Sequence, residues 1–134
     1  MALNLVAGAW GAAAWVRNRA SVAFWYLLRA AQVSVLVQVT LGAALLIAGH
    51  EAADGLHYMY GTAPLLVNLV AEAMRAGAAQ REIPERVAFE SLPAPQQRVV
   101  ALLIVKREMG IMSVACLVVV AFAVRAAQVS GGLF

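Results

Sequence analysis

The chain alternates long apolar runs with short polar joints. Apolar residues dominate four runs, at positions 1–16, 21–49, 56–79 and 107–127. A helix needs about 20 residues to cross the ~30 Å hydrocarbon core of a bilayer, so the first run is close to the lower limit and the second exceeds the requirement. The pattern predicts four transmembrane helices in a single integral membrane domain that covers residues 1–134.

The basic residues gather in two of the three joints. The first joint is Arg17-Asn18-Arg19, and the long loop 80–106 carries Arg81, Arg86, Arg98 and Lys106, with Arg75 and Arg107 beside it. The middle joint, residues 50–55, contains two acidic residues and no Lys or Arg. Basic loops are retained on the cytoplasmic side of a membrane. The charges therefore predict an all-α, up-and-down four-helix bundle in the cell membrane, multi-pass, with both termini outside (N-out/C-out).

The loop 80–106 contains a helical pattern of its own. Prolines interrupt it at positions 84, 93 and 95, and after Pro95 apolar residues recur at helical spacing among polar ones. This predicts an amphipathic cytoplasmic helix before the last span. The helix either runs on into that span or lies on the inner leaflet.

Composition supports a membrane location and argues against nucleic acid as a partner. The chain is 63% hydrophobic and 13% charged, about half the charged share of a soluble domain, so lipid must cover part of its surface. The net charge of +3 comes from the basic joints that flank the apolar runs. Cys116, the single cysteine, cannot form an intrachain disulfide and is expected to pack as a small apolar residue.

The first apolar run has two interpretations. No basic residue precedes it, and Arg17 and Arg19 follow it, as expected for a retained helix with an outside N-terminus. The small residues Ala12, Ala13 and Ala14 leave cleavage as a signal peptide open.

Polar residues occur inside the apolar runs at two depths. Gln38 and Asn68 each lie ~15–17 Å from the outer end of their runs. We expect an interhelical hydrogen bond between these side-chain amides, with a pore or ligand contact as the alternative.

A second polar layer lies near the inner end. Four charged residues have similar depth there: Arg29, Glu72, Arg107 and Glu108. Opposite charges stabilise one another in a poorly solvated layer, so Glu72 is expected to pair with Arg29 or Arg107, unless each side chain extends separately to water. Nearby, Phe24-Trp25-Tyr26 is expected to form an aromatic belt at the interface.

Histidines mark the acidic joint. His50, Asp54 and His57 would share one face of a helix, and imidazole with carboxylate suits Zn²⁺ or a similar metal. In another interpretation Asp54 caps the third helix, and His57 and Tyr58 belong to the outer aromatic belt. In a third, His57 contacts a haem or a quinone.

Two resemblances add to this picture. The run Val37-Gln38-Val39-Thr40-Leu41-Gly42-Ala43, followed by His57, resembles half of a haem A synthase, in which a Gln-x-x-Leu-Gly helix precedes a haem-ligating histidine helix. The resemblance covers two helices and implies haem as a cofactor, His57 as an axial ligand, and Gln38 and Tyr58 beside it. Because that family is built of two such halves, a second ligand would come from another copy or another protein.

Three further motifs carry a second resemblance, which covers most of the chain. They are Leu56-His57-Tyr58-x-Tyr60-Gly61, Ala71-Glu72-x-x-Arg75 and Arg107-Glu108-x-Gly110-x-Met112. Together they resemble an uncharacterised family of four-span membrane proteins from high-GC bacteria. This resemblance implies the fold and carries no function.

The sequence contains no nucleophile–base pair, phosphate loop or Cys/His metal motif. It therefore favours a non-catalytic small integral-membrane subunit, or an accessory protein of a larger membrane assembly. The expected partners are membrane lipid and other membrane subunits or a second copy, because small residues on the spans (Gly8, Gly11, Ala12, Gly42, Ala43 and Gly110) permit close helix approach. The alternative function is a haem- or metal-binding membrane redox protein that uses His57.

Overall fold

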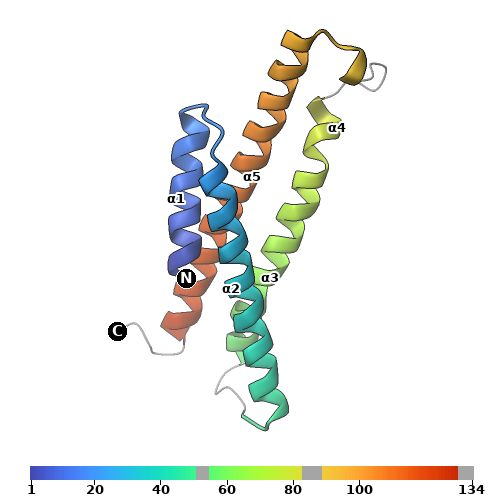
Figure 1. Ribbon diagram of the computed structural model, residues 1–134. Coiled ribbons are helices and arrows are strands. Elements are labelled where there is room, and N and C mark those ends of the chain that lie inside the picture. The colour runs from blue at the N-terminus through green and yellow to red at the C-terminus, as the bar shows by residue number, and fades with distance from the viewer. Residues whose placement is uncertain (51–54, 83–88, 130–134) are drawn as a thin grey trace.

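The computed structural model describes residues 1–50, 55–82 and 89–129. Its elements are α1 (Ala2–Val16), α2 (Val22–Ile47), α3 (Gly55–Ala76), α4 (Ala78–Glu82), the 3₁₀ turn η1 (Phe89–Ser91) and α5 (Ala94–Val129). No strand occurs among the described residues, so the all-α expectation is confirmed. The four long helices run alternately up and down in Figure 1. We call the end with the α1–α2 joint and the start of α5 the upper end, and the end with the α2–α3 connection the lower end.

Local signals set the helix ends. The Ser21 hydroxyl caps α2 by accepting a hydrogen bond from the Phe24 backbone N–H. The joint before it turns at Asn18, whose φ of 54° is a conformation that asparagine tolerates better than most residues. At the other end of α2, Gly49 adopts a φ of 85° and the His50 N–H donates to the Leu45 carbonyl. This arrangement resembles a Schellman turn, which reverses the chain after the helix.

The amphipathic segment and the last apolar run form one helix. α5 starts directly after Pro93, has Pro95 in its first turn, and continues without a break for 36 residues, or ~54 Å. Of the two sequence interpretations, the one in which the amphipathic helix runs on into the last apolar run is therefore confirmed, and the one in which it lies separately on a leaflet is wrong. The upper part of α5 contacts α4.

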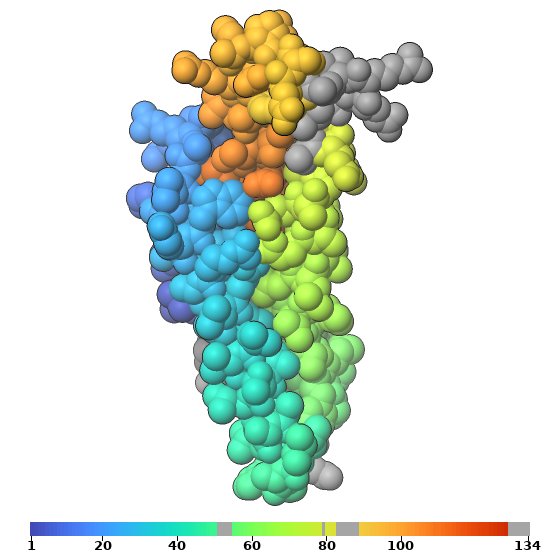
Figure 2. Space-filling view, turned by 45° about the vertical axis from the view of Figure 1, so that its right-hand side comes forward, coloured from blue at the N-terminus to red at the C-terminus, as the bar shows by residue number. Residues whose placement is uncertain are grey.

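α5 is the central helix of the arrangement. It packs against α1 and α3, whereas α2 lies mainly against α1, meets α3 less and barely touches α5. Figure 2 shows α2 and α3 side by side down to the lower end. The core is built from fully buried side chains of α2 and α5, namely Phe24, Leu28, Met109, Met112 and Cys116. The burial of Cys116 agrees with its expected role as a small apolar residue.

Glycines determine where the helices approach most closely. A Cβ on Gly11 would lie 2.3 Å from Phe24 Cε2 and from Ser113 Oγ, so α1 contacts α2 and α5 through backbone at this point. A Cβ on Gly110 would lie 2.8 Å from Trp15 Cε2. Gly42, by contrast, has no atom within 4 Å of its would-be Cβ. Some of the small residues noted in the sequence therefore serve packing within the chain, and Gly42 does not.

The three aromatic residues at the start of α2 differ in burial. Phe24 is fully buried beneath Gly11, Trp25 is partly buried and Tyr26 is exposed. The belt expectation is therefore wrong for Phe24, because successive residues of a helix point in directions about 100° apart and only Phe24 of these three is fully buried in the core.

Two helices of the described part of the chain, α2 and α5, are long and apolar enough to cross a membrane by length and composition. α1 is apolar but shorter. Much of this apolar surface is exposed, including Leu36, Leu41, Leu45 and Ile47 of α2. An apolar surface of this extent requires lipid or protein to cover it.

Candidate functional site

A groove lies between the lower halves of α2 and α3. Its volume is about 780 Å³, within the range of ~300–1,000 Å³ typical of ligand sites. We call it the α2–α3 groove, and its walls include Val37, Gln38, Leu41, Gly42, Leu45, Leu46, His50, His57, Tyr58, Gly61 and Thr62. Most of its lining is apolar; His50, His57 and Tyr58 lie at its lower end, and Ser34 and Gln38 lie higher along α2.

The residues that the haem A synthase resemblance singled out meet in this groove. His57, Tyr58 and Gln38 all line it, and His57 and Tyr58 pack edge to face with ring centroids 6.2 Å apart. His50 lines the same groove, because the turn at Gly49 reverses the chain after α2. The structure thus offers a second imidazole from this chain, where the sequence suggested one from another copy.

The proposed metal triad is not assembled among the described residues. Asp54 lies outside them, and no group of three His, Cys, Asp or Glu side chains within them is placed to hold a metal ion. The groove lining contains no Arg or Lys, so the propionates of a haem would find no cationic partner among these residues.

A polar network lies nearer the upper end, between α2 and α3. Arg29 Nη1 donates to Glu72 Oε1 at 2.6 Å and to Gln32 Oε1 at 2.6 Å, and Gln32 Nε2 donates to the same Glu72 oxygen at 2.8 Å. Arg75 Nε donates to Glu72 Oε2 at 2.7 Å. Both Glu72 oxygens are therefore engaged by cations, and the expected contact between Glu72 and Arg29 is present.

The other charged residues of this layer pair differently. Arg107 forms an ion pair with Glu82 of α4 instead of Glu72. Glu108 approaches Arg75, with 4.0 Å between Arg75 Nη1 and Glu108 Oε1. Arg107 lies one residue before Glu108 on α5, so the two side chains point to different neighbours.

Sequence reasoning missed two members of this network. Gln32 follows Arg29 by three residues and Arg75 follows Glu72 by three, so each pair shares a helix face. That spacing could have identified both. Arg75 also lies over the Trp25 ring, with its guanidinium carbon 5.9 Å from the ring centroid, a cation–π contact that no local spacing reveals.

The expected hydrogen bond between Gln38 and Asn68 does not satisfy both amides. Asn68 is 7% exposed, and its Oδ1 accepts no hydrogen bond from the described residues. Gln38 is exposed on the face of α2 that lines the groove. The prediction is wrong because equal depth does not make two side-chain amides face each other.

Asn4, which the sequence did not single out, is the most buried amide. It is 1% exposed, and both its Oδ1 and its Nδ2 lack a partner among the described residues. It borders a cavity of about 180 Å³ that Gln38 and Tyr60 also line. A cavity of this size with amide groups on its wall is large enough for ordered water.

The fold and the site together define an all-α protein with extensive exposed apolar surface, a histidine-lined groove and an ion-paired layer. No family model, curated protein or solved structure matches the chain. The functional argument therefore depends on this geometry.

Proposed function

We propose that the protein is a non-catalytic integral-membrane subunit that receives a transmembrane helix of a larger membrane assembly in the α2–α3 groove. The observation that carries this proposal is the state of the lower part of α2. Every residue from Thr40 to His50 is exposed, although this segment is mostly apolar and belongs to a helix packed on other helices at its upper end. A partner would complete its packing.

The chemistry of the groove favours a helix over lipid alone. Gly42, Ala43 and Gly61 lie along it and present backbone, and Gln38 and Thr62 supply polar groups. Membrane helices associate through small residues and interhelical hydrogen bonds of this kind. Within the chain, Gly8, Gly11 and Gly110 already serve this purpose, since a Cβ on any of them would collide with a neighbouring helix.

The proposal includes four membrane spans with both termini outside. The upper end carries the exposed basic residues Arg17, Arg19, Arg81, Arg98 and Lys106, which the positive-inside rule assigns to the cytoplasm. α2, with 26 residues, is ~39 Å long and exceeds the ~30 Å hydrocarbon core. Its upper turn, with Tyr26 and Arg29, would then reach the inner headgroup layer.

Cysteine labelling tests this orientation. In a Cys116→Ala background, Gln128→Cys should react with a membrane-impermeant reagent added outside intact cells, and Ala20→Cys should not. Both positions are exposed in the fold, so access depends on the side of the membrane. Labelling of the Ala20 variant without the Gln128 variant would reverse the topology.

Photo-crosslinking in native membranes tests the docking of a partner. A photo-reactive residue at Gly42 should give a discrete adduct with another membrane protein, whereas one at Leu69, which is 59% exposed and outside the groove, should give none. Gly42→Phe fills the groove and should lower co-purification of that protein by about tenfold, which corresponds to ~1.4 kcal/mol, whereas Leu69→Phe leaves it unchanged. An adduct only with a second copy, or the same adducts from both positions, would exclude the accessory-subunit proposal.

The second candidate function is a haem- or metal-binding redox protein, and the observation that favours it is that His50 and His57 line one groove. Haem bound there would supply one-electron transfer. His57→Phe keeps an aromatic ring and removes the lone pair that ligation needs. On this candidate the wild-type protein shows a Soret band or a stoichiometric metal, and His57→Phe loses it. On the docking proposal His57→Phe has no such effect, and wild-type protein free of haem and metal excludes the second candidate.

A further inference from the structure

We propose that Trp15, Asn18 and Lys106 form a headgroup site for an anionic phospholipid, whose acyl chain lies in a second groove between α3 and α5. This inference rests on the membrane placement proposed above. It concerns the opposite end of the molecule from the α2–α3 groove and a different class of ligand.

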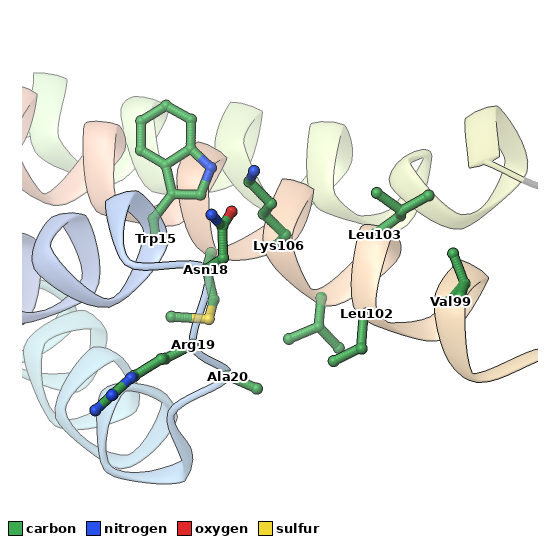
Figure 3. A pocket seen from close by; sticks show the side chains of 10 residues that line it. Trp15, Asn18, Arg19, Ala20, Val99, Leu102, Leu103 and Lys106 are labelled. Carbon is green, nitrogen blue, oxygen red and sulfur yellow. The ribbon is translucent and has the colours of Figure 1, made fainter. Parts of the chain in front are cut away.

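The headgroup site is a pocket of about 240 Å³ between the α1–α2 joint and α5. Figure 3 shows the Lys106 amine, the Asn18 amide and the Trp15 indole on the same side of the joint, while Arg19 points away. The ion pairs of the described residues engage Arg29, Arg75 and Arg107, and Lys106 is not among them. An ammonium beside an amide and an indole N–H is suited to bind the oxygens of a phosphate.

The acyl site is a groove of about 640 Å³ with an almost wholly apolar lining. Leu66, Val70 and Met74 of α3 form one wall, and Val114 and Val118 of α5 belong to the other. From Arg107 to Val118 the groove follows α5 for three turns, or ~16 Å. This length is close to half of the ~30 Å hydrocarbon core and therefore matches an acyl chain in one leaflet.

Trp15 connects the two parts because it lines both the pocket and the groove. Its indole lies against Gly110, where a Cβ would come within 2.8 Å of the ring. Gly110 therefore lets the ring approach α5 closely at the top of the groove. Tryptophan is enriched at the membrane interface, and the cytoplasmic leaflet carries the anionic lipids that attract Lys and Arg. A largely apolar pocket that carries the Lys106 amine, at the upper end of a leaflet-long apolar groove, fits a phospholipid better than a soluble anion.

Native mass spectrometry of the full-length protein in mild detergent tests the site, with phosphatidylglycerol and phosphatidylcholine as probes. The wild-type protein should retain phosphatidylglycerol and lose phosphatidylcholine. Lys106→Gln should weaken phosphatidylglycerol binding by about fivefold, the effect of one cation near a lipid surface. Arg98→Gln removes an exposed cation of the same helix that lines neither the pocket nor the groove and should have no effect. Val114→Trp fills the groove at an exposed position and should also reduce binding, whereas Leu69→Trp should not.

Three results would overturn the proposal. In the first, the protein retains the two lipids equally. In the second, Lys106→Gln and Val114→Trp both bind phosphatidylglycerol as the wild-type protein does. In the third, inorganic phosphate displaces phosphatidylglycerol, which would identify a site for a free anion. The measurement uses purified protein and needs no partner helix. If no crosslink forms at Gly42 and lipid binding is intact, only the docking proposal is rejected. If the crosslink forms and the selective lipid binding is absent, only the lipid site is rejected.

Discussion

Gly11→Ala is expected to destabilise the protein more than any other change of a single methyl group. The added Cβ would lie 2.3 Å from Phe24 Cε2 and 2.3 Å from Ser113 Oγ. Phe24 is fully buried and Ser113 is held by a hydrogen bond from its hydroxyl to the Met109 carbonyl at 2.6 Å, so neither can move aside easily. Overpacking of this kind costs ~1–3 kcal/mol or more. A thermal unfolding measurement in detergent should show a clear decrease in the melting temperature.

Two other glycines provide a graded comparison. Gly8→Ala should cost less, because the nearest atom to its Cβ is Leu117 Cδ2 at 2.9 Å, the end of a flexible and exposed side chain. Gly42→Ala should raise stability by ~0.5–1 kcal/mol, since nothing lies within 4 Å of its Cβ and alanine favours a helix interior over glycine. If all three variants unfold at the same temperature, the close contact of α1 with α2 and α5 is not formed in solution.

The extent of the helices was predictable from the sequence because the signals are local. The run 56–79 corresponds to α3 at Gly55–Ala76, and α5 begins between Pro93 and Pro95 as the breakers indicate. Two signals indicate where a helix begins and ends: a long stretch without charged residues, and the positions of Pro and Gly. Both involve only residues that are neighbours in the sequence. Which side of a helix faces the core depends on the rotation of the helix about its own axis. In a nearly uniform apolar segment, no local sequence pattern specifies that rotation. Phe24 shows this, since it is buried only because Gly11 lies opposite.

The same difference explains the two polar layers. Counting residues estimates depth and leaves rotation undetermined. Arg29 and Glu72 have long side chains that reach each other across a range of rotations, so equal depth was enough to predict their contact. Gln38 and Asn68 together reach less far than an arginine and a glutamate, and Asn68 Oδ1 is left without a partner among the described residues. Equal depth therefore predicts a contact between an arginine and a carboxylate well, and a contact between two side-chain amides poorly.

The histidine groove was predictable in part. The positions of His57 and Tyr58 at the start of α3 followed from the apolar run, and Gln38 was identified through its motif. The entry of His50 into the same groove depends on the backbone at Gly49, where a positive φ and the hydrogen bond from His50 N–H to the Leu45 carbonyl reverse the chain. A glycine directly after a helix is a known signal for such a turn, so this part could have been found by considering the cap.

Glu72→Gln is expected to lower stability in detergent because Glu72 is the acceptor shared by three donors from two helices. The substitution keeps the size of the side chain and removes the charge that balances Arg29 and Arg75, whose hydrogen bonds to its oxygens measure 2.6 and 2.7 Å. Hydrogen bonds to charged groups contribute ~1.5–3 kcal/mol, and the partial exposure of the Glu72 side chain places the expected loss at the lower end of that range. Arg29 keeps its hydrogen bond to Gln32 Oε1 but loses the only carboxylate that it contacts among the described residues, whereas Arg75 still has Glu108 at 4.0 Å.

A charge-swapped pair separates the ion pair from other effects of the substitution. Arg29→Glu combined with Glu72→Arg should recover part of the stability that each single variant loses, as a coupling energy in a double-mutant cycle. Glu90→Gln is the matched control, since Glu90 is an exposed glutamate of η1 and takes part in none of the ion pairs found among the described residues. If Glu72→Gln unfolds at the wild-type temperature and disrupts function in cells, the carboxylate serves a ligand or a proton, because a structural ion pair at this depth cannot lose its charge without lowering stability.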